Sequence, residues 1–193
     1  MAVCILILSA CSSDAHPRAV ESASAASNRQ TTVTTEAGDS LALDCRNPVA
    51  EMPAPESGYE VVDDAVALAT SATSGTALQT STSGDPDPAR RLFAKTGLLV
   101  RTNVRSEFIV PPAWHDRVSF RWGNAGARDA TEHLVVGPCD GPDGWIAFPG
   151  GYLVSSPACV DFVVRTAAGD HPVTVGVGAP CDGQRPPPEP SDA

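Results

Sequence analysis

The chain has 193 residues and a net charge of −10, and its length suits one domain with additional segments at its ends. The counterion release that drives binding to phosphate backbones has no source in so acidic a protein, so we expect no nucleic-acid partner. No stretch approaches the roughly 18 apolar residues needed to span a bilayer, which excludes a multi-pass membrane protein.

The N-terminal residues 1–10 have the outline of an export signal, because an apolar run at residues 2–8 is followed by small and then polar residues. No Lys or Arg precedes this run, so we expect the coding sequence to begin upstream. The residues Leu8-Ser9-Ala10-Cys11 resemble the lipobox of bacterial lipoproteins. That resemblance implies that the signal peptide is removed before Cys11 and that a diacylglyceryl group, with fatty acids such as palmitate, is attached to the Cys11 thiol.

Residues 11–38 are expected to join this lipidated cysteine to the rest of the protein. Residues 12–38 are rich in Ser, Ala and Thr and show no periodicity, which predicts a disordered tether. A flexible segment of this length has an r.m.s. reach of about 30 Å. Two or three acyl chains would hold the protein firmly, since each buried CH₂ contributes about 0.8 kcal/mol. We therefore expect an exported protein whose membrane partner is reached through the lipid anchor, facing outward.

Between residues 39 and 181, apolar residues alternate with polar ones, as in strands with one buried face. The clearest alternation lies at 118–122, 160–165 and 173–177, and less regular runs lie at 40–43, 59–69, 92–100, 107–110, 133–136 and 145–154. Turn residues separate these runs. The pattern predicts one all-β domain, an antiparallel β-sandwich of Ig-like or jelly-roll-like type.

Three stretches depart from this rhythm. Residues 70–90 are rich in Ser, Thr and Gly and too long for an ordinary connection, which predicts a mobile loop. Residues 182–193 are rich in Pro and predict a disordered tail. The sequence Pro149-Gly150-Gly151 interrupts the run at 145–154 and would either bulge the strand or turn the chain.

Four cysteines remain once Cys4 leaves with the signal peptide and Cys11 is acylated. Four cysteines in an exported domain predict two disulfides, and their spacings do not fit a zinc site. They are Cys45, Cys139, Cys159 and Cys181.

The pairing follows from the expected strand order. If 160–165 and 173–177 form a hairpin with Arg165 opposite Val173, Cys159 comes close to Cys181, which leaves Cys45 for Cys139. A true turn at Pro149-Gly150-Gly151 would instead bring Cys139 toward Cys159.

Aromatic side chains are the candidate ligand contacts. Trp122 lies in phase with the apolar residues of its strand and is expected in the core. Trp114 follows two prolines in a loop, and Trp145 and Tyr152 flank Pro149-Gly150-Gly151, so each could line a surface groove.

Catalytic motifs are not evident, and we expect no catalytic residue, cofactor or bound metal. His115, His133 and His171 are the imidazoles of the domain, each beside a carboxylate in sequence. Neighbours on a strand point to opposite faces, so these pairs do not form dyads by sequence alone. The residues Asp85 and Asp87 are ordinary turn formers.

The stretch from Cys139 onward, with Trp145-x-x-Phe148-x-Gly150-Gly151-Tyr152, resembles exported proteins of unassigned function from high-G+C bacteria. That resemblance implies an exported protein and no particular activity. Our leading hypothesis is a lipid-anchored envelope protein that binds an envelope protein or a cell-wall glycan and is not an enzyme. The alternative is an envelope hydrolase that uses His115, His133 or His171.

Overall fold

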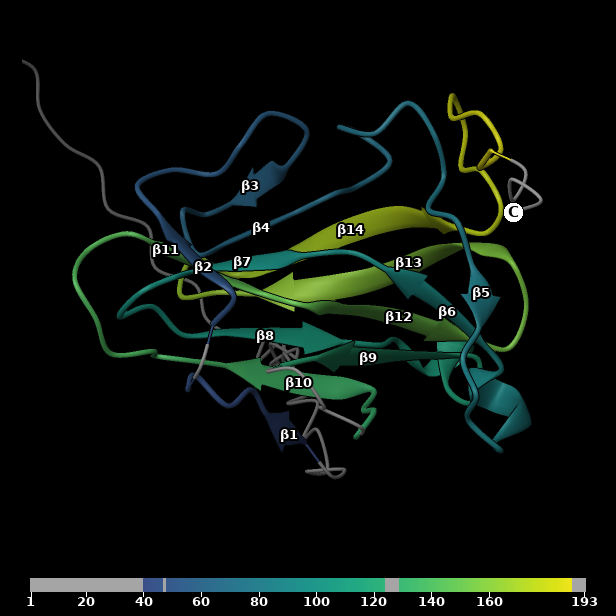
Figure 1. Ribbon diagram of the computed structural model, residues 1–193, viewed down its shortest axis with the longest axis horizontal. Helices are drawn as coiled ribbons and strands as arrows, with labels where there is room; N and C mark the ends of the chain where they lie inside the picture. The colour runs from purple at the N-terminus through teal and green to yellow at the C-terminus, as the bar shows by residue number, and fades with distance from the viewer. Residues whose placement is uncertain (1–39, 47, 124–128, 189–193) are drawn as a thin grey trace, which may run out of the picture. The chain divides into compact units, whose positions relative to one another are not determined.

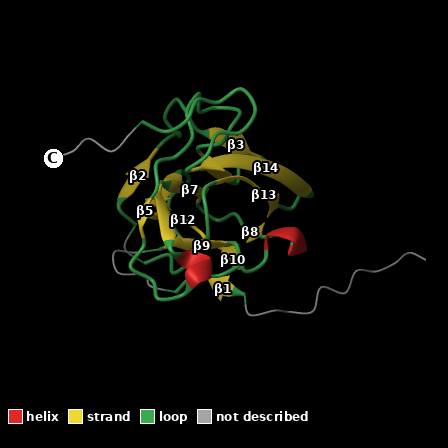
Figure 2. Cartoon of the chain, turned by 90° about the vertical axis from the view of Figure 1, so that its right-hand side faces the viewer, coloured by secondary structure: helices red, strands yellow, loops and turns green. Residues whose placement is uncertain are grey.

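The computed structural model describes residues 40–46, 48–123 and 129–188. Within them the chain is almost entirely β, with antiparallel sheets packed together, which confirms the expected all-β sandwich (Figures 1 and 2). The helical elements of this part are two short 3-10 turns, η1 (Pro88–Arg90) and η2 (Pro112–Trp114). The residues of the predicted signal peptide (1–10), Cys11 and the predicted tether (12–38) lie outside the described residues.

The first sheet contains five strands, and all its neighbouring pairs are antiparallel except the parallel pair of β1 and β10. Its order is β1 (Leu41–Ala42), β10 (His133–Val136), β8 (Ser106–Ile109), β13 (Ala158–Arg165) and β14 (Asp170–Val177).

The second and third sheets are antiparallel throughout. The second has the order β2 (Ala50–Met52), β11 (Trp145–Phe148), β7 (Leu98–Arg101), β4 (Val66–Leu68) and β3 (Glu60–Val62). The third has the order β5 (Ser81–Thr82), β6 (Leu92–Lys95), β12 (Gly150–Val154) and β9 (Val118–Trp122).

One ladder runs through both of these sheets. The pair β6–β12 and the pair β7–β11 keep a single register, and Thr96 N–H donates to Gly150 C=O between them. In the run expected at 145–154, the chain therefore bends at Pro149 but does not turn back. Gly150 and Gly151 have φ of 153° and 156° there, which glycine adopts at little cost.

The main core lies between the first sheet and this bent ladder. Its centre is an aromatic cluster whose ring centroids are 5.0 to 6.2 Å apart, typical of favourable edge-to-face and offset contacts. The members are Phe108, Phe120, Trp122, Tyr152 and Phe162. Trp122 is thus in the core, as expected from its place in the alternating pattern.

Tyr152 is fully buried, and its hydroxyl has no hydrogen-bond partner among the described residues. An unsatisfied buried hydroxyl costs free energy, because it has left water without a replacement partner. We expect Tyr152→Phe to leave the free energy of unfolding unchanged or to raise it by about 1 kcal/mol. Urea unfolding would measure it. Tyr152→Leu, which also removes ring contacts, is the control and should be destabilising; a clear loss in the Phe variant would contradict the prediction.

Both disulfides have the expected pairing, Cys45–Cys139 and Cys159–Cys181. The register expected for the last hairpin is wrong by three residues, because Arg165 faces Asp170 and not Val173. The turn is tight, with reciprocal backbone hydrogen bonds between Thr166 and Gly169. Strand β14 can include Pro172 because it is an edge strand, where a missing N–H need not break the ladder.

Two segment boundaries also differ from the expectation. The stretch 70–90 contains β5 and η1, and Leu78 N–H donates to Gly176 C=O beside β14. The tail is hydrogen-bonded up to Arg185, whose N–H donates to Gly75 C=O. Ala77 is buried in this contact region. The domain therefore extends beyond Cys181, because backbone groups of residues 70–90 and of the tail form hydrogen bonds at the edge of the first sheet.

Candidate functional site

The second sheet is apolar on both faces. Residues Ile146 and Phe148 of β11 point into the main core, whereas Trp145 and Ala147 belong to a separate buried cluster on the opposite, outer face. Strands β4 and β7 have the same arrangement, with Ala67 and Leu99 on the outer face. One cross-strand row on that face consists entirely of apolar residues: Ala50, Ala147, Leu99, Ala67 and Val61.

This outer face carries a groove of about 580 Å³, here called the apolar groove. Val49, Met52, Tyr59, Leu99 and Ala147 contribute its apolar lining. Val49 is 61% exposed and Val61, in the row described above, is 47% exposed, and they are the exposed large hydrophobic residues of the described chain. A ligand pocket is commonly concave, mostly apolar and of this size. The apolar groove is therefore the best candidate site that the fold offers.

The segment between β2 and β3 closes one side of the apolar groove. These strands lie at opposite edges of the second sheet, so residues 53–59 connect one edge with the other. Tyr59 packs against the outer cluster, and a Cβ at Gly97 would lie 3.0 Å from its hydroxyl. Burial raises the pKa of the Tyr59 phenol, and the Glu56 carboxylate raises it further. The phenol is accordingly a neutral side chain with an apolar ring near neutral pH.

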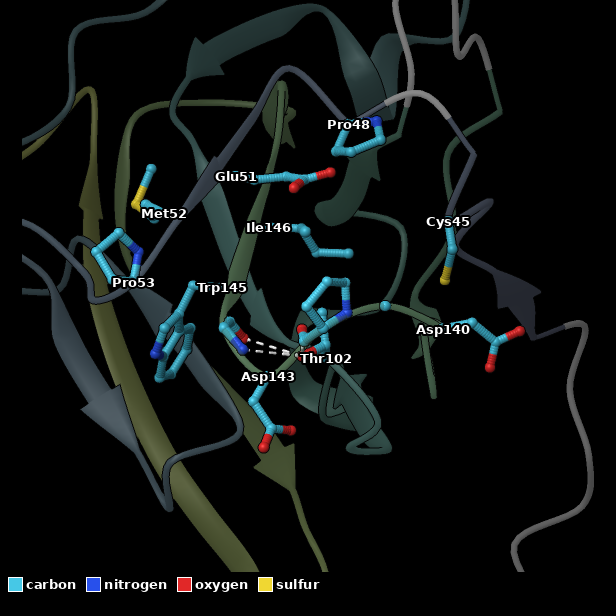
Figure 3. Close-up of a pocket in the computed structure, with 13 residues that line it drawn as sticks. Cys45, Pro48, Glu51, Met52, Pro53, Thr102, Asp140, Asp143, Trp145 and Ile146 are labelled. Atoms are coloured by element: carbon cyan, nitrogen blue, oxygen red, sulfur yellow. Dashed lines mark hydrogen bonds between the residues drawn. The ribbon is translucent and has the colours of Figure 1, made fainter.

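A second groove, of about 410 Å³, adjoins the apolar groove and is here called the acidic groove. Figure 3 shows Met52, Pro53 and Trp145 on one side of it and Cys45 and Asp140 on the other. Met52 lines both grooves. The loop that forms the acidic groove is held by the Thr102 hydroxyl, which donates to Pro142 C=O and accepts from Gly144 N–H.

Of the three aromatic candidates, Trp145 lines a groove as expected, whereas Tyr152 does not. Tyr152 is in the main core and lines no groove, because its strand β12 turns that face inward. Trp145 lines the acidic groove but is only 3% exposed, since Met52 packs against it. Trp114 is half-buried against the core, and the Arg117 guanidinium lies 4.5 Å from its ring centroid. None of the three therefore presents an open ring face for a sugar.

The histidines contact residues distant in sequence. His133 Nε2 lies 3.0 Å from Glu107 Oε2 on the neighbouring strand. His115 Nε2 lies 3.0 Å from Val110 O. Neither histidine forms a hydrogen bond or ion pair with the carboxylate beside it in sequence, but His115 Nδ1 lies 3.7 Å from Glu132, the residue that precedes His133.

His171 belongs to a cluster of three side chains at the end of the β13–β14 hairpin. Its Nε2 lies 2.5 Å from Asp63 Oδ2. The Thr166 hydroxyl donates to the same Asp63 oxygen, and is 3.5 Å from the imidazole. A nucleophile in a catalytic triad would donate to the imidazole, which a carboxylate would hold from its other nitrogen. The observed arrangement instead ties the β3–β4 turn to the hairpin.

Glu107 is the carboxyl with the best-defined surroundings. Burial alone would raise its pKa, but hydrogen bonds from His133 and Arg105 outweigh burial and hold the pKa below its usual 4.5. A group with a lowered pKa in the folded state stabilises the protein above its unfolded-state pKa, and that contribution is lost as the pH falls through the folded-state value.

We therefore expect Glu107→Gln to reduce the loss of unfolding free energy that accompanies acidification below pH 4.5. Urea unfolding at several pH values would measure this slope. Glu51→Gln changes an exposed carboxyl without an ion pair among the described residues and serves as the control. Identical slopes for the Glu107 variant and the unmodified protein would refute the assignment.

No group of three or more His, Cys, Asp or Glu side chains suited to a metal ion occurs in residues 40–46, 48–123 and 129–188. Asp85 instead contacts Arg121 at 2.9 Å, and Asp87 caps η1 by accepting from Ala89 N–H. In the same part of the chain, no helix is long and apolar enough to cross a membrane.

Comparison with protein-family models, with curated proteins and with solved structures finds no match to this chain. The similarity of residues 8–11 to a lipobox therefore stays a prediction from the sequence. The two disulfides indicate an oxidising, exported compartment.

The apolar groove was not predicted from the sequence, although a signal for it exists. The strands β4, β7 and β11 contain uninterrupted apolar runs at Val66–Leu68, Leu98–Val100 and Trp145–Phe148. A continuous apolar run is typical of a strand buried on both faces, whereas alternation indicates one buried face. The three runs together indicate that the second sheet is covered on both sides.

Proposed function

We propose that this protein is a lipid-anchored envelope lipoprotein whose β-sandwich binds a protein partner on the outer face of the second sheet. The observation that carries the proposal is the apolar groove, with Val49 61% exposed at its border. Exposed apolar surface that is concave and rimmed by polar residues commonly marks an interaction site. The lipid anchor at Cys11 and the tether would keep the domain near the membrane.

A protein partner fits the groove better than a cell-wall glycan does. Sugars stack on open aromatic faces, and Trp145 and Tyr152 are buried while Arg117 lies over Trp114. Aliphatic side chains such as Val49, Met52 and Leu99 instead favour burial of apolar partner surface. A hydrolase is less well supported, since the hydroxyl of Thr166 donates to Asp63 and not to His171.

Photocrosslinking in intact cells tests the binding. A benzophenone amino acid in place of Val49 should give discrete adducts with another protein, whereas the same residue in place of Ala167, exposed in the β13–β14 turn, should give none. Adducts of equal yield from both positions, or none from Val49, would refute binding at this face.

Mass spectrometry of the membrane-extracted protein tests the anchor. The N-terminal peptide should begin with acylated Cys11, and Cys11→Ala should release the protein from the membrane fraction. An unmodified Cys11, or a variant that remains fully membrane-bound, would refute lipid anchoring while leaving the binding experiment unaffected.

A further inference from the structure

The two adjoining grooves are bordered mainly by negative charge. Five side chains in their linings are charged near neutral pH: four are carboxylates and one is an amine, and all five are exposed. None of the five has an ion-pair partner among the described residues. They are Glu51, Glu56, Asp140, Asp143 and Lys95.

These charges restrict what can cover the apolar groove. A second copy of the chain would bring together two surfaces of the same sign on molecules that each carry a net charge of −10. Like charges brought face to face cost free energy, and an anionic lipid surface is repelled for the same reason. A partner with Lys or Arg side chains is attracted instead, because its charge complements the four carboxylates.

The apolar groove sets the second requirement. Val49, Met52, Tyr59 and Leu99 form an apolar part of its lining, which a purely basic segment would leave uncovered. An apolar side chain placed there would remove its own surface and part of that of Val49 from water, which favours binding.

We propose that the outer face of the second sheet binds a basic polypeptide segment that inserts an apolar side chain into the apolar groove. The segment's Lys or Arg side chains pair with Glu51 and Glu56, and with Asp140 and Asp143 along the acidic groove. This inference rests on the proposed protein-binding function and specifies the chemistry of the partner.

Binding of short peptides to the full chain with Cys11→Ala tests this chemistry. Without acyl chains the protein needs no detergent, which would compete for the apolar groove. The probe is acetyl-Arg-Leu-Arg-Phe-Arg-amide, and the matched controls replace Arg by Glu, or Leu and Phe by Ser. The probe should bind at least about tenfold more tightly than either control, and its affinity should fall as salt rises because the exposed charges are screened.

Variants locate the binding site. Val49→Asp and Glu51→Gln with Glu56→Gln should each weaken binding of the probe several-fold, and exposed positions keep these variants folded. Asp182→Asn removes an exposed carboxyl outside both grooves and should have no effect. Lys95 is the single lysine of the chain, so its rate of acetylation reports directly on the groove and should fall when the probe is bound.

Other outcomes would overturn the inference. Equal binding of the Glu peptide would show that charge is not recognised, and equal binding of the Ser peptide would show that the apolar groove is not used. If triacetylchitotriose protected Lys95 from acetylation, the face would be assigned to a glycan. Protection by dihexanoyl-phosphatidylglycerol would assign it to a lipid, and protection by self-association that Val49→Asp abolishes would assign it to a second copy of the chain. Protein adducts at Val49 in cells without selective peptide binding would refute the basic segment alone; the absence of adducts would refute protein binding itself.

Discussion

Removal of the Cys45–Cys139 disulfide is expected to lower the free energy of unfolding by about 4 to 5 kcal/mol. The bond joins residues 94 apart in sequence, so its loss gives the unfolded chain a large gain in entropy. The disulfide also links two loops, because Cys45 lies between β1 and β2 and Cys139 lies between β10 and β11. The double variant Cys45→Ala with Cys139→Ala, measured by urea unfolding, tests this value.

The second disulfide provides the comparison. Cys159 and Cys181 are only 22 residues apart, and the same argument gives about 3 kcal/mol for their removal. The variant lacking Cys45–Cys139 should therefore be the less stable of the two. The opposite order would mean that local packing around Cys181, and not loop closure, dominates the stabilisation.

Gly151→Ala is expected to destabilise the protein by at least about 3 kcal/mol. A Cβ at this position would lie 1.9 Å from Ala94 O in the neighbouring strand, and φ is 156°, where an L side chain is strained. The clash is with backbone, so no side-chain rotation relieves it. The melting temperature should fall by roughly 10 °C for a domain of this size, and a thermal scan followed by circular dichroism would measure it.

Gly169→Ala is the matched control. Its φ is 140°, but a Cβ there meets no atom within 4 Å. This variant should lose only the cost of backbone strain, about 1 kcal/mol. Equal losses in the two variants would show that the close approach of β6 to β12 is relieved by a small shift of the strands.

The sequence predicts the long strands well because their physics is local. A strand with one buried face is enough to produce the alternation of Val118, Phe120 and Trp122. Strand β9 spans the predicted residues. Strands β2 and β5 were not predicted, because strands of three and two residues are too short to show an alternating pattern. The run at 59–69 is a hairpin, turned by Asp63 and Asp64 with φ of 49° and 52°.

The candidate site was harder to predict because it depends on neighbours distant in sequence. Trp145 is a large aromatic residue beside a loop, but whether its ring faces solvent depends on Met52, from the adjacent strand β2. Tyr152 lies three residues beyond the bend at Pro149, on the inward side of β12. Sequence position alone cannot distinguish these two faces, whereas the pairing of strands decides both.

The ladder shared by the second and third sheets has a consequence for how the domain unfolds. Strands β6 and β7 are joined through Thr96 and Gly97, and β11 and β12 through Pro149, so neither sheet can separate from the core without pulling on the other. Cooperative opening of such a unit gives its amide hydrogens a common free energy of exchange. We therefore expect the amides of β7 and β11 to exchange together with those of β6 and β12, although Leu99 and Ala147 also line the apolar groove on the outer face.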